Sequence, residues 1–362
     1  MFPYYILVGT PLLFSFFYGL YDNGLQAKKK KNYNIIIFFV IYFFLLAFRD
    51  VSVGIDLSSY LYYFNRVESM SWKAIVDYNA VELGYLFLNK AIQYISKDFQ
   101  VFLGVAAAIC CIPMAFLYYK ESENGVISIL LYLTATSIFV LNFSGLRQAI
   151  AIAFAVPAFY CVKNKKIIKF IILVFIATFF HTSAWIMLIM YPVYHIKLGA
   201  KHAALLITPA VFVTFLFRNQ IFNFLLKFVG EEYEEKYSST ENTGATTMII
   251  LIALFVIFSF IGVDKAKEDS EFNGFRNILV ISLFLQLFAT VNNVAMRFNY
   301  YFLLFLPITV TKVMNRASER DKSIMTVISI IFILFFTFYY FYDAYTGADI
   351  LQVYPYVSIF GQ

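Results

Sequence analysis

The chain has 362 residues, of which 61% are hydrophobic and only 14% are charged. Soluble domains carry nearer a quarter of charged residues, so this composition excludes a water-soluble globule and leaves no room for a large soluble domain. The net charge of +6 does not indicate nucleic-acid binding, because the Lys and Arg residues are scattered in short loops between apolar runs, as the positive-inside rule predicts. The three cysteines all lie inside apolar runs without metal-ligand spacing, which favours packing over a disulfide or a metal site.

Apolar runs long enough to cross a bilayer recur from the first residues to the last. The first run has no basic region before it, so we expect a transmembrane helix there and not a cleaved signal. The sequence predicts an all-α polytopic membrane protein, a single membrane domain over 1–362 with about twelve transmembrane helices. The predicted spans are 3–20, 33–48, 99–119, 126–141, 145–162, 166–180, 183–196, 203–217, 246–263, 275–292, 298–314 and 324–342.

Basic residues set the predicted orientation. An extracytoplasmic N-terminus places most of the 28 Lys and Arg residues in the cytoplasm, with Lys28–Lys31 as the strongest anchor. Residues 82–96 look helical but carry Glu82 and Lys90, and counting them as a span would move the basic cluster 163–166 outside. We therefore expect a re-entrant or interfacial helix at 82–96. Two larger extracytoplasmic segments result, 49–98 and 218–245, the second with a strongly acidic stretch.

Charged residues that interrupt the apolar runs sort to the outer face of this scheme. A charge at the end of a spanning helix is costly, so such residues usually face a cavity and have a function. Their shared side predicts one polar site that is built by several helices and opens away from the cytoplasm. The residues are Arg49, Asp56, Glu82, Arg147, His181 and Arg297.

The segment after the second predicted span contains a turn followed by a helix. Gly54 allows a tight turn, and Asp56 can cap a helix that begins at Leu57. Tyr60 and Phe64 then share one helical face. An ordinary turn with an interfacial aromatic belt is the alternative interpretation of this segment, and a snorkelling anchor is the alternative for Arg49.

Three further segments offer donors on the same predicted side. Arg147, followed by Gln148, begins a predicted helix whose first turn also has unpaired N–H groups, a combination suited to a phosphate; a lipid contact is the alternative. His181 lies at a bend between two helices and is either functional or merely hydrogen-bonded in a core. Arg297 and its neighbours can donate to a polyanion or a sugar, although an aromatic-belt turn would look the same.

The sequence has no Walker glycine loop, no HExxH, no cysteine-based zinc pattern and no paired carboxylates typical of a metal-bound nucleotide sugar. These absences favour metal-independent chemistry on a donor that is already activated, with no cofactor.

The order of these motifs resembles the EpsG family of Wzy-like bacterial polysaccharide polymerases. The likeness runs from Arg49 and Gly54-Ile-Asp56 through Glu82-Leu-Gly-Tyr85, Ser144-Gly-Leu-Arg-Gln148 and His181-Thr-Ser183 to Arg297-Phe-Asn-Tyr300 and a late Tyr354-Pro-Tyr356. It covers almost the whole chain. One departure is Ser144, where the family more often has Asn; Asn142 lies nearby.

The resemblance implies a multi-pass glycosyltransferase of the bacterial cytoplasmic (inner) membrane with its active site on the extracytoplasmic side. Both substrates would be undecaprenyl-pyrophosphate-linked glycans, a donor and an acceptor, and the product an O antigen, capsule or exopolysaccharide. Membrane lipids, a chain-length regulator and a flippase are the expected partners, and nucleic acid is not.

The pyrophosphate needs fixed cations, and the acceptor hydroxyl needs a base. We expect Arg147, Arg297 and Arg49 at the pyrophosphate. The predicted base is His181, with Asp56 next and Glu82 as a third candidate. Substrate contacts are expected from Tyr60, Tyr85, Gln148, Asn299 and Tyr300.

Rival functions remain open from the sequence. A polyprenyl-phosphate-sugar glycosyltransferase that adds a single sugar is the closest, and it usually shows an acidic pair in the first outer loop. A flippase for lipid-linked sugars would have cation sites accessible from both sides, whereas those predicted here cluster on one. A membrane O-acyltransferase would place its histidine toward a cytoplasmic acyl donor.

Overall fold

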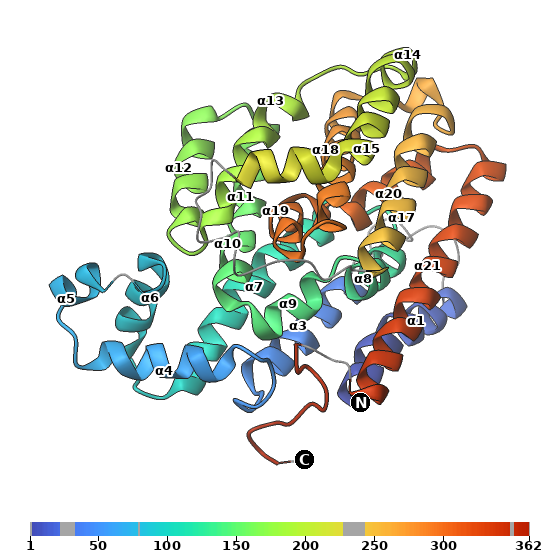
Figure 1. Ribbon diagram of the computed structural model, residues 1–362. Coiled ribbons are helices and arrows are strands. Elements are labelled where there is room, and N and C mark those ends of the chain that lie inside the picture. The colour runs from blue at the N-terminus through green and yellow to red at the C-terminus, as the bar shows by residue number, and fades with distance from the viewer. Residues whose placement is uncertain (1, 22–32, 79, 227–242, 348–350, 362) are drawn as a thin grey trace. The chain divides into compact units, whose positions relative to one another are not determined.

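The computed structural model describes residues 2–21, 33–78, 80–226, 243–347 and 351–361 (Figure 1). About 80% of the described residues are helical, and they form isolated β-bridges but no strand. The fold is therefore an all-α membrane fold, as the sequence predicts.

The chain forms two compact units, residues 1–185 with 333–362 and residues 186–332. The prediction of a single membrane domain is not tested by this division and stays a prediction.

The helices of the first unit follow the apolar runs closely. They are α1 (Phe2–Tyr21), α3 (Tyr33–Ala47), α4 (Leu57–Glu68), α5 (Trp72–Asp77), α6 (Leu83–Gln93), α7 (Phe99–Glu121), α8 (Gly125–Thr134), α9 (Ile138–Ser144), α10 (Leu146–Ala153), α11 (Ala155–Lys163), α12 (Ile167–Thr178) and the 3₁₀ helix η1 (Thr182–Ile189), which continues into the second unit.

The second unit contains α13 (Met190–Tyr194), α14 (Ala200–His202), the π-helix η2 (Ala203–Ile207), α15 (Thr208–Leu226), α17 (Thr243–Ile261), η3 (Lys265–Lys267), α18 (Ser270–Ala289), α19 (Asn293–Leu303) and α20 (Leu306–Arg316). The long helix α21 (Glu319–Thr346) begins in this unit and ends in the first.

Fewer helices than predicted are long enough to span a bilayer alone. In the described part of the chain five pass by length and apolarity, or six when the pair α8–α9, bent by 52°, counts as one. The five are Phe99–Glu121, Leu146–Lys163, Ala200–Phe224, Ser270–Ala289 and Glu319–Thr346. The protein is multi-pass, but the count of about twelve spans is not confirmed.

Local hydrogen bonding explains the break between α8 and α9. The Thr134 and Thr136 hydroxyls donate to carbonyls four residues earlier, and Ser137 adopts a positive φ of 57°. Hydroxyls that bond back to the preceding turn compete with helix continuation. The sequence predicts one unbroken span over 126–141, because three hydroxyl residues within an apolar run do not by themselves indicate a bend.

The predicted outer segment 49–98 is mostly helical, because α4, α5 and α6 pack together on the N-terminal part of α7. Helix α6 has 11 residues and is about 16 Å long, too short to cross a bilayer. A helix within 82–96 is thus confirmed, while its re-entrant or interfacial placement stays a prediction. Asp56 occupies the N-cap position of α4, but its side chain makes no capping hydrogen bond, so the predicted cap is wrong in that respect.

The second predicted outer segment is only partly described. Residues 218–226 form the end of α15, and α17 begins at Thr243. The acidic stretch between them lies outside the described residues, as does the basic anchor Lys28–Lys31.

The C-terminal segment 351–361 lies along residues 48–55. The N–H groups of Asp50 and Gly54 donate to the carbonyls of Val357 and Gln352 at 2.9 and 2.8 Å. The Tyr356 hydroxyl donates to the carbonyl of Leu45 at 3.0 Å. This segment therefore covers the chain around Arg49.

Candidate functional site

An ion pair between Glu82 and Arg147 joins two segments that are 65 residues apart. Glu82 immediately precedes α6, and Arg147 lies in the first turn of α10, which begins after Gly145. Both side chains are partly exposed, Arg147 by 30% and Glu82 by 17%. The pair is thus reachable from solvent.

The start of α6 is also fixed to the turn that contains His181. The Gly84 N–H donates to the Phe179 carbonyl at 2.8 Å. A Cβ at position 84 would lie 2.7 Å from that oxygen and 2.8 Å from the Phe179 Cβ, so only glycine allows this approach. The contact brings the Glu82 and His181 segments together.

His181 and Gln148 are connected through Ser183. The Ser183 hydroxyl lies 2.6 Å from His181 Nδ1, and Gln148 Nε2 donates to the same hydroxyl at 3.4 Å. Gln148 is the neighbour of Arg147 in α10. Predicted residues from three separate motifs therefore converge: Glu82, Arg147 with Gln148, and His181.

Tyr60 joins this cluster from α4. Its side chain hydrogen-bonds with Arg147, and its hydroxyl also lies in the field of Asp56. Burial raises the pKa of Tyr60, the Arg147 charge opposes that rise, and the phenol stays neutral at physiological pH. Tyr60 supports the arginine and is nearly completely buried.

Two aromatic residues singled out in the sequence lie in the core of the first unit, and the substrate contact expected of Tyr85 stays a prediction. Tyr85 and Phe64 are 0% and 1% exposed and pack with Tyr60 in the core formed by α4, α6 and α7. The Tyr85 hydroxyl donates to the Tyr60 carbonyl at 3.4 Å. These rings hold the outer segment together.

Arg49 is buried away from solvent, and none of its described contacts is with the Glu82–Arg147 pair. Its side chain is packed beside the Phe143 ring, 5.4 Å from the centroid, and Nη1 donates to the Leu46 carbonyl at 3.2 Å. Nε and Nη2 have no hydrogen-bond partner among the described residues. Burial lowers the pKa of Arg49 to about 10, so the guanidinium is still charged at neutral pH.

The predicted motif Arg297-Phe-Asn-Tyr300 belongs to the second unit. Helix α19 begins at Asn293, so Arg297 lies a full turn inside it and not at its start as predicted. Asn299 is 0% exposed; it donates to Gln286 at 2.7 Å and accepts from Ser282 at 2.9 Å. Asn299 thus braces α18 against α19, and its expected role as a substrate donor stays a prediction. Arg297 and Tyr300 are half-buried on the same helix.

The EpsG family model matches residues 32–358. The chain belongs to the EpsG family. This confirms the resemblance drawn from the motifs and supports a polysaccharide polymerase-type function. No curated protein and no solved structure matches the chain.

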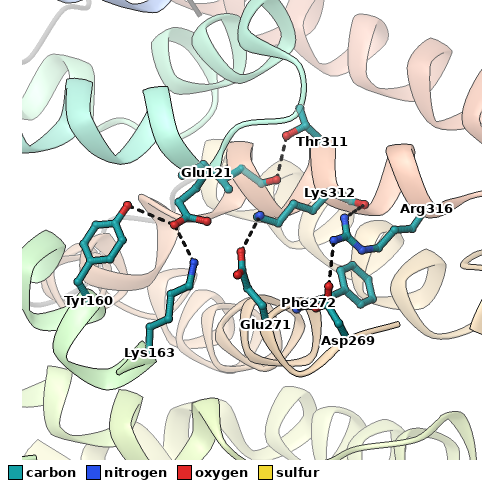
Figure 2. A network of polar contacts seen from close by, with 10 residues as sticks. Glu121, Tyr160, Lys163, Asp269, Glu271, Phe272, Thr311, Lys312 and Arg316 are labelled. Atoms are coloured by element: carbon teal, nitrogen blue, oxygen red, sulfur yellow. Dashed lines mark hydrogen bonds and ion pairs between the residues drawn. The ribbon is translucent and has the colours of Figure 1, made fainter. Parts of the chain in front are cut away.

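This EpsG-family protein also has ion pairs that the sequence motifs did not reveal. In the first unit Lys163 and Tyr160 both reach Glu121, at 2.9 and 3.2 Å (Figure 2). In the second unit Lys312 pairs with Glu271 at 3.1 Å and Arg316 with Asp269 at 3.5 Å (Figure 2). Each lies at a helix end, where the sequence shows only scattered loop charges.

Across the described ranges of this EpsG-family protein no group of three or more His, Cys, Asp or Glu side chains has the geometry to hold a metal ion.

Proposed function

We propose that this protein polymerises undecaprenyl-pyrophosphate-linked oligosaccharide repeat units on the outer face of the bacterial cytoplasmic membrane. The product would be a surface polysaccharide of the O-antigen, capsule or exopolysaccharide type. The observation that carries this proposal is the convergence of Glu82, Arg147 and His181, from three separate motifs, at one end of the candidate span Leu146–Lys163.

The reaction exchanges one bond to the anomeric carbon for another. The bond from that carbon to the pyrophosphate oxygen breaks, and its electron pair leaves with the pyrophosphate. The acceptor hydroxyl oxygen forms the new glycosidic bond and loses its proton to a base. Because the donor is already activated, the step needs neither a nucleotide sugar nor ATP.

Arg147 is suited to the pyrophosphate because its planar guanidinium can bind phosphate oxygens through two N–H groups. Its pairing with Glu82 fixes its position before substrate arrives, which avoids reorganisation during the reaction. Arg297, on α19 of the second unit, is a second candidate for binding pyrophosphate. Arg49 is the third candidate and the least accessible of the three, because it is buried. Asp56, Glu82 and His181 remain candidates for the base.

Incubation of the purified protein with a lipid-linked repeat unit tests this proposal. A ladder of products is expected from the wild-type chain, and none from Arg147→Ala. Glu121→Gln is the matched control because it removes a carboxylate paired with Lys163 at the other end of the same span. A single addition would instead indicate a polyprenyl-linked transferase, and relocation of the lipid alone a flippase.

A further inference from the structure

His181 takes part in a short hydrogen-bond chain with Ser183 and Gln148. Gln148 Nε2 donates to Ser183 Oγ at 3.4 Å, and Ser183 Oγ lies 2.6 Å from His181 Nδ1. The backbone N–H of Ser183 donates to the same Nδ1 at 3.3 Å. The hydroxyl and the backbone N–H of Ser183 thus both contact Nδ1 of His181.

The proton position on His181 follows from these directions. A backbone N–H can only donate, so the Ser183 N–H makes Nδ1 an acceptor, and the Ser183 hydroxyl 2.6 Å away then turns its own hydrogen toward the same nitrogen. The hydroxyl oxygen still has lone pairs that accept from Gln148, and the assignment holds whichever way the Gln148 amide is oriented. Nδ1 therefore carries no proton, and the neutral imidazole holds its proton on Nε2.

We propose that Gln148 and Ser183 are positioning residues that fix His181 as an Nε2–H donor, which hydrogen-bonds the departing pyrophosphate and does not deprotonate the acceptor. This inference rests on the proposed function. It differs from the sequence-based prediction of His181 as the base, because the one basic lone pair of the neutral ring is already engaged by Ser183.

The location of the chain supports an anion as the ligand of Nε2–H. Gln148 follows Arg147 in the first turn of α10, so the residue that orients His181 is next to the proposed pyrophosphate arginine. His181 is half-buried, and its turn is held to α6 through Gly84 and Phe179. A prepositioned neutral donor beside a fixed cation stabilises the charge that develops on a leaving phosphate oxygen.

The proposed step is balanced without transfer of the histidine proton. The anomeric carbon–oxygen bond breaks, the electron pair stays on the pyrophosphate oxygen, and Nε2–H donates a hydrogen bond to that phosphate. The proton of the acceptor hydroxyl goes to a carboxylate, Asp56 or Glu82. His181 begins and ends the cycle neutral.

Two substitutions of His181 distinguish a donor from a base. His181→Gln keeps an N–H donor close to the Nε2 position, whereas His181→Glu supplies a carboxylate that accepts protons but does not donate at neutral pH. We expect His181→Gln to retain at least tenfold more turnover than His181→Glu at matched expression. Equal or greater turnover in His181→Glu would overturn the proposal.

Variants of Ser183 test the positioning role. Ser183→Thr keeps the hydroxyl and should retain activity, whereas Ser183→Ala loses it and should lower kcat several-fold. KM for the lipid-linked donor should change little in either variant. Full activity in Ser183→Ala would remove the hydroxyl from the mechanism.

The decisive measurement reads the proton position directly and needs no substrate. The full chain with His195→Gln and His202→Gln keeps one histidine, and its ¹⁵N-labelled imidazole gives distinct nitrogen shifts for the two neutral tautomers. We expect the Nε2–H tautomer in this protein and a shift toward a mixture in Ser183→Ala combined with Gln148→Leu. A dominant Nδ1–H tautomer would overturn the assignment.

Failure of the wild-type chain to form any polymer would instead overturn the proposed function. The tautomer measurement would still decide the proton position on His181.

Discussion

Arg147 and Lys163 lie at opposite ends of one candidate membrane span, and each pairs with a carboxylate from another segment. Arg147 pairs with Glu82 before α6, and Lys163 with Glu121 at the end of α7. At 1.5 Å per residue the two basic residues are about 24 Å apart along the helix. If the helix crosses the bilayer, one pair faces each side, and only the Arg147 end also has the His181 network.

Swapping the two charges of the Glu82–Arg147 pair tests whether the pair only stabilises the fold or also takes part in the reaction. Arg147→Ala should abolish polymer formation, with a loss of about 2–4 kcal/mol of transition-state stabilisation. Arg147→Lys should not restore full activity, because an ammonium lacks the planar fork. The exchange Glu82→Arg with Arg147→Glu should restore expression and thermal stability but not polymerisation, as measured by ladder assays on purified protein.

The pair at the other end of the span supplies the control for that experiment. The exchange Glu121→Lys with Lys163→Glu should keep both stability and polymerisation, since these residues are placed far from the proposed chemistry. Wild-type ladders from the Glu82–Arg147 exchange would show that the arginine serves only to hold α6.

Because α6 approaches the His181 turn closely, adding one methyl group at Gly84 should strongly destabilise the protein. Gly84→Ala places a Cβ 2.7 Å from the Phe179 carbonyl oxygen, so the two segments must separate. We expect a destabilisation of about 1–3 kcal/mol, measured by thermal unfolding in detergent, together with reduced polymerisation. Gly104→Ala in α7 is the matched control, because nothing lies within 4 Å of a Cβ there. Equal stability of the two variants would contradict the described packing.

Apolar periodicity predicted the helices well because burial of backbone in lipid or core forces helix formation wherever such runs occur. It could not predict the bend at Ser137 or the 3₁₀ helix after His181, which depend on local hydroxyl bonding and on neighbouring packing. The number of spans was therefore the least secure part of the prediction.

The site could be predicted only as a set of residue types. Glu82, Arg147 and His181 were singled out because charge is rare at membrane helix ends, and the structure brings these three motifs together. Sequence could not show that Tyr85 is completely buried or that Asn299 is used within its own helix pair, since both depend on tertiary contacts. Ser183 belongs to the His181-Thr-Ser183 motif, but its hydrogen bonds to His181 and Gln148 depend on tertiary contacts that the sequence does not show.

The exposed face of the outer segment is where sugar contacts are expected. Trp72 is 46% exposed and stacks on the exposed ring of Tyr94, with centroids 6.2 Å apart. Trp72→Ala should raise KM for the lipid-linked acceptor several-fold and leave kcat unchanged, because an aromatic face contributes binding and not chemistry. Tyr345→Ala, at a 90% exposed ring on α21, is the control. An unchanged KM in Trp72→Ala would move the sugar site elsewhere.

The predicted orientation can be tested with described, exposed positions. In a chain with Cys161→Ser, and with Cys110 and Cys111 buried, Ser58→Cys should react with an impermeant thiol reagent on intact cells. Lys166→Cys should react only after permeabilisation, because basic loops stay in the cytoplasm. The opposite labelling pattern would invert the topology and place the Glu82–Arg147 pair in the cytoplasm.

Removal of the Arg49 charge is expected to raise the stability of the folded protein. Its guanidinium is 1% exposed, two of its nitrogens have no described partner, and burial lowers its pKa to about 10. The folded state therefore disfavours the protonated form. The unfolded chain binds more protons as the pH rises above about 10, so the penalty is full at neutral pH and is relieved only in strong alkali.

Arg49→Met keeps the length of the side chain and removes the charge. We expect its free energy of unfolding at pH 7 to rise by about 1–3 kcal/mol, because a buried unpaired charge costs more than its remaining contacts return. Arg66→Met, at an exposed arginine of α4, should change stability by less than about 0.5 kcal/mol. Thermal unfolding in one detergent compares the two variants. Destabilisation in Arg49→Met would show that the charge is compensated in the folded protein, whereas a stable variant that makes no polymer would support Arg49 as a pyrophosphate ligand.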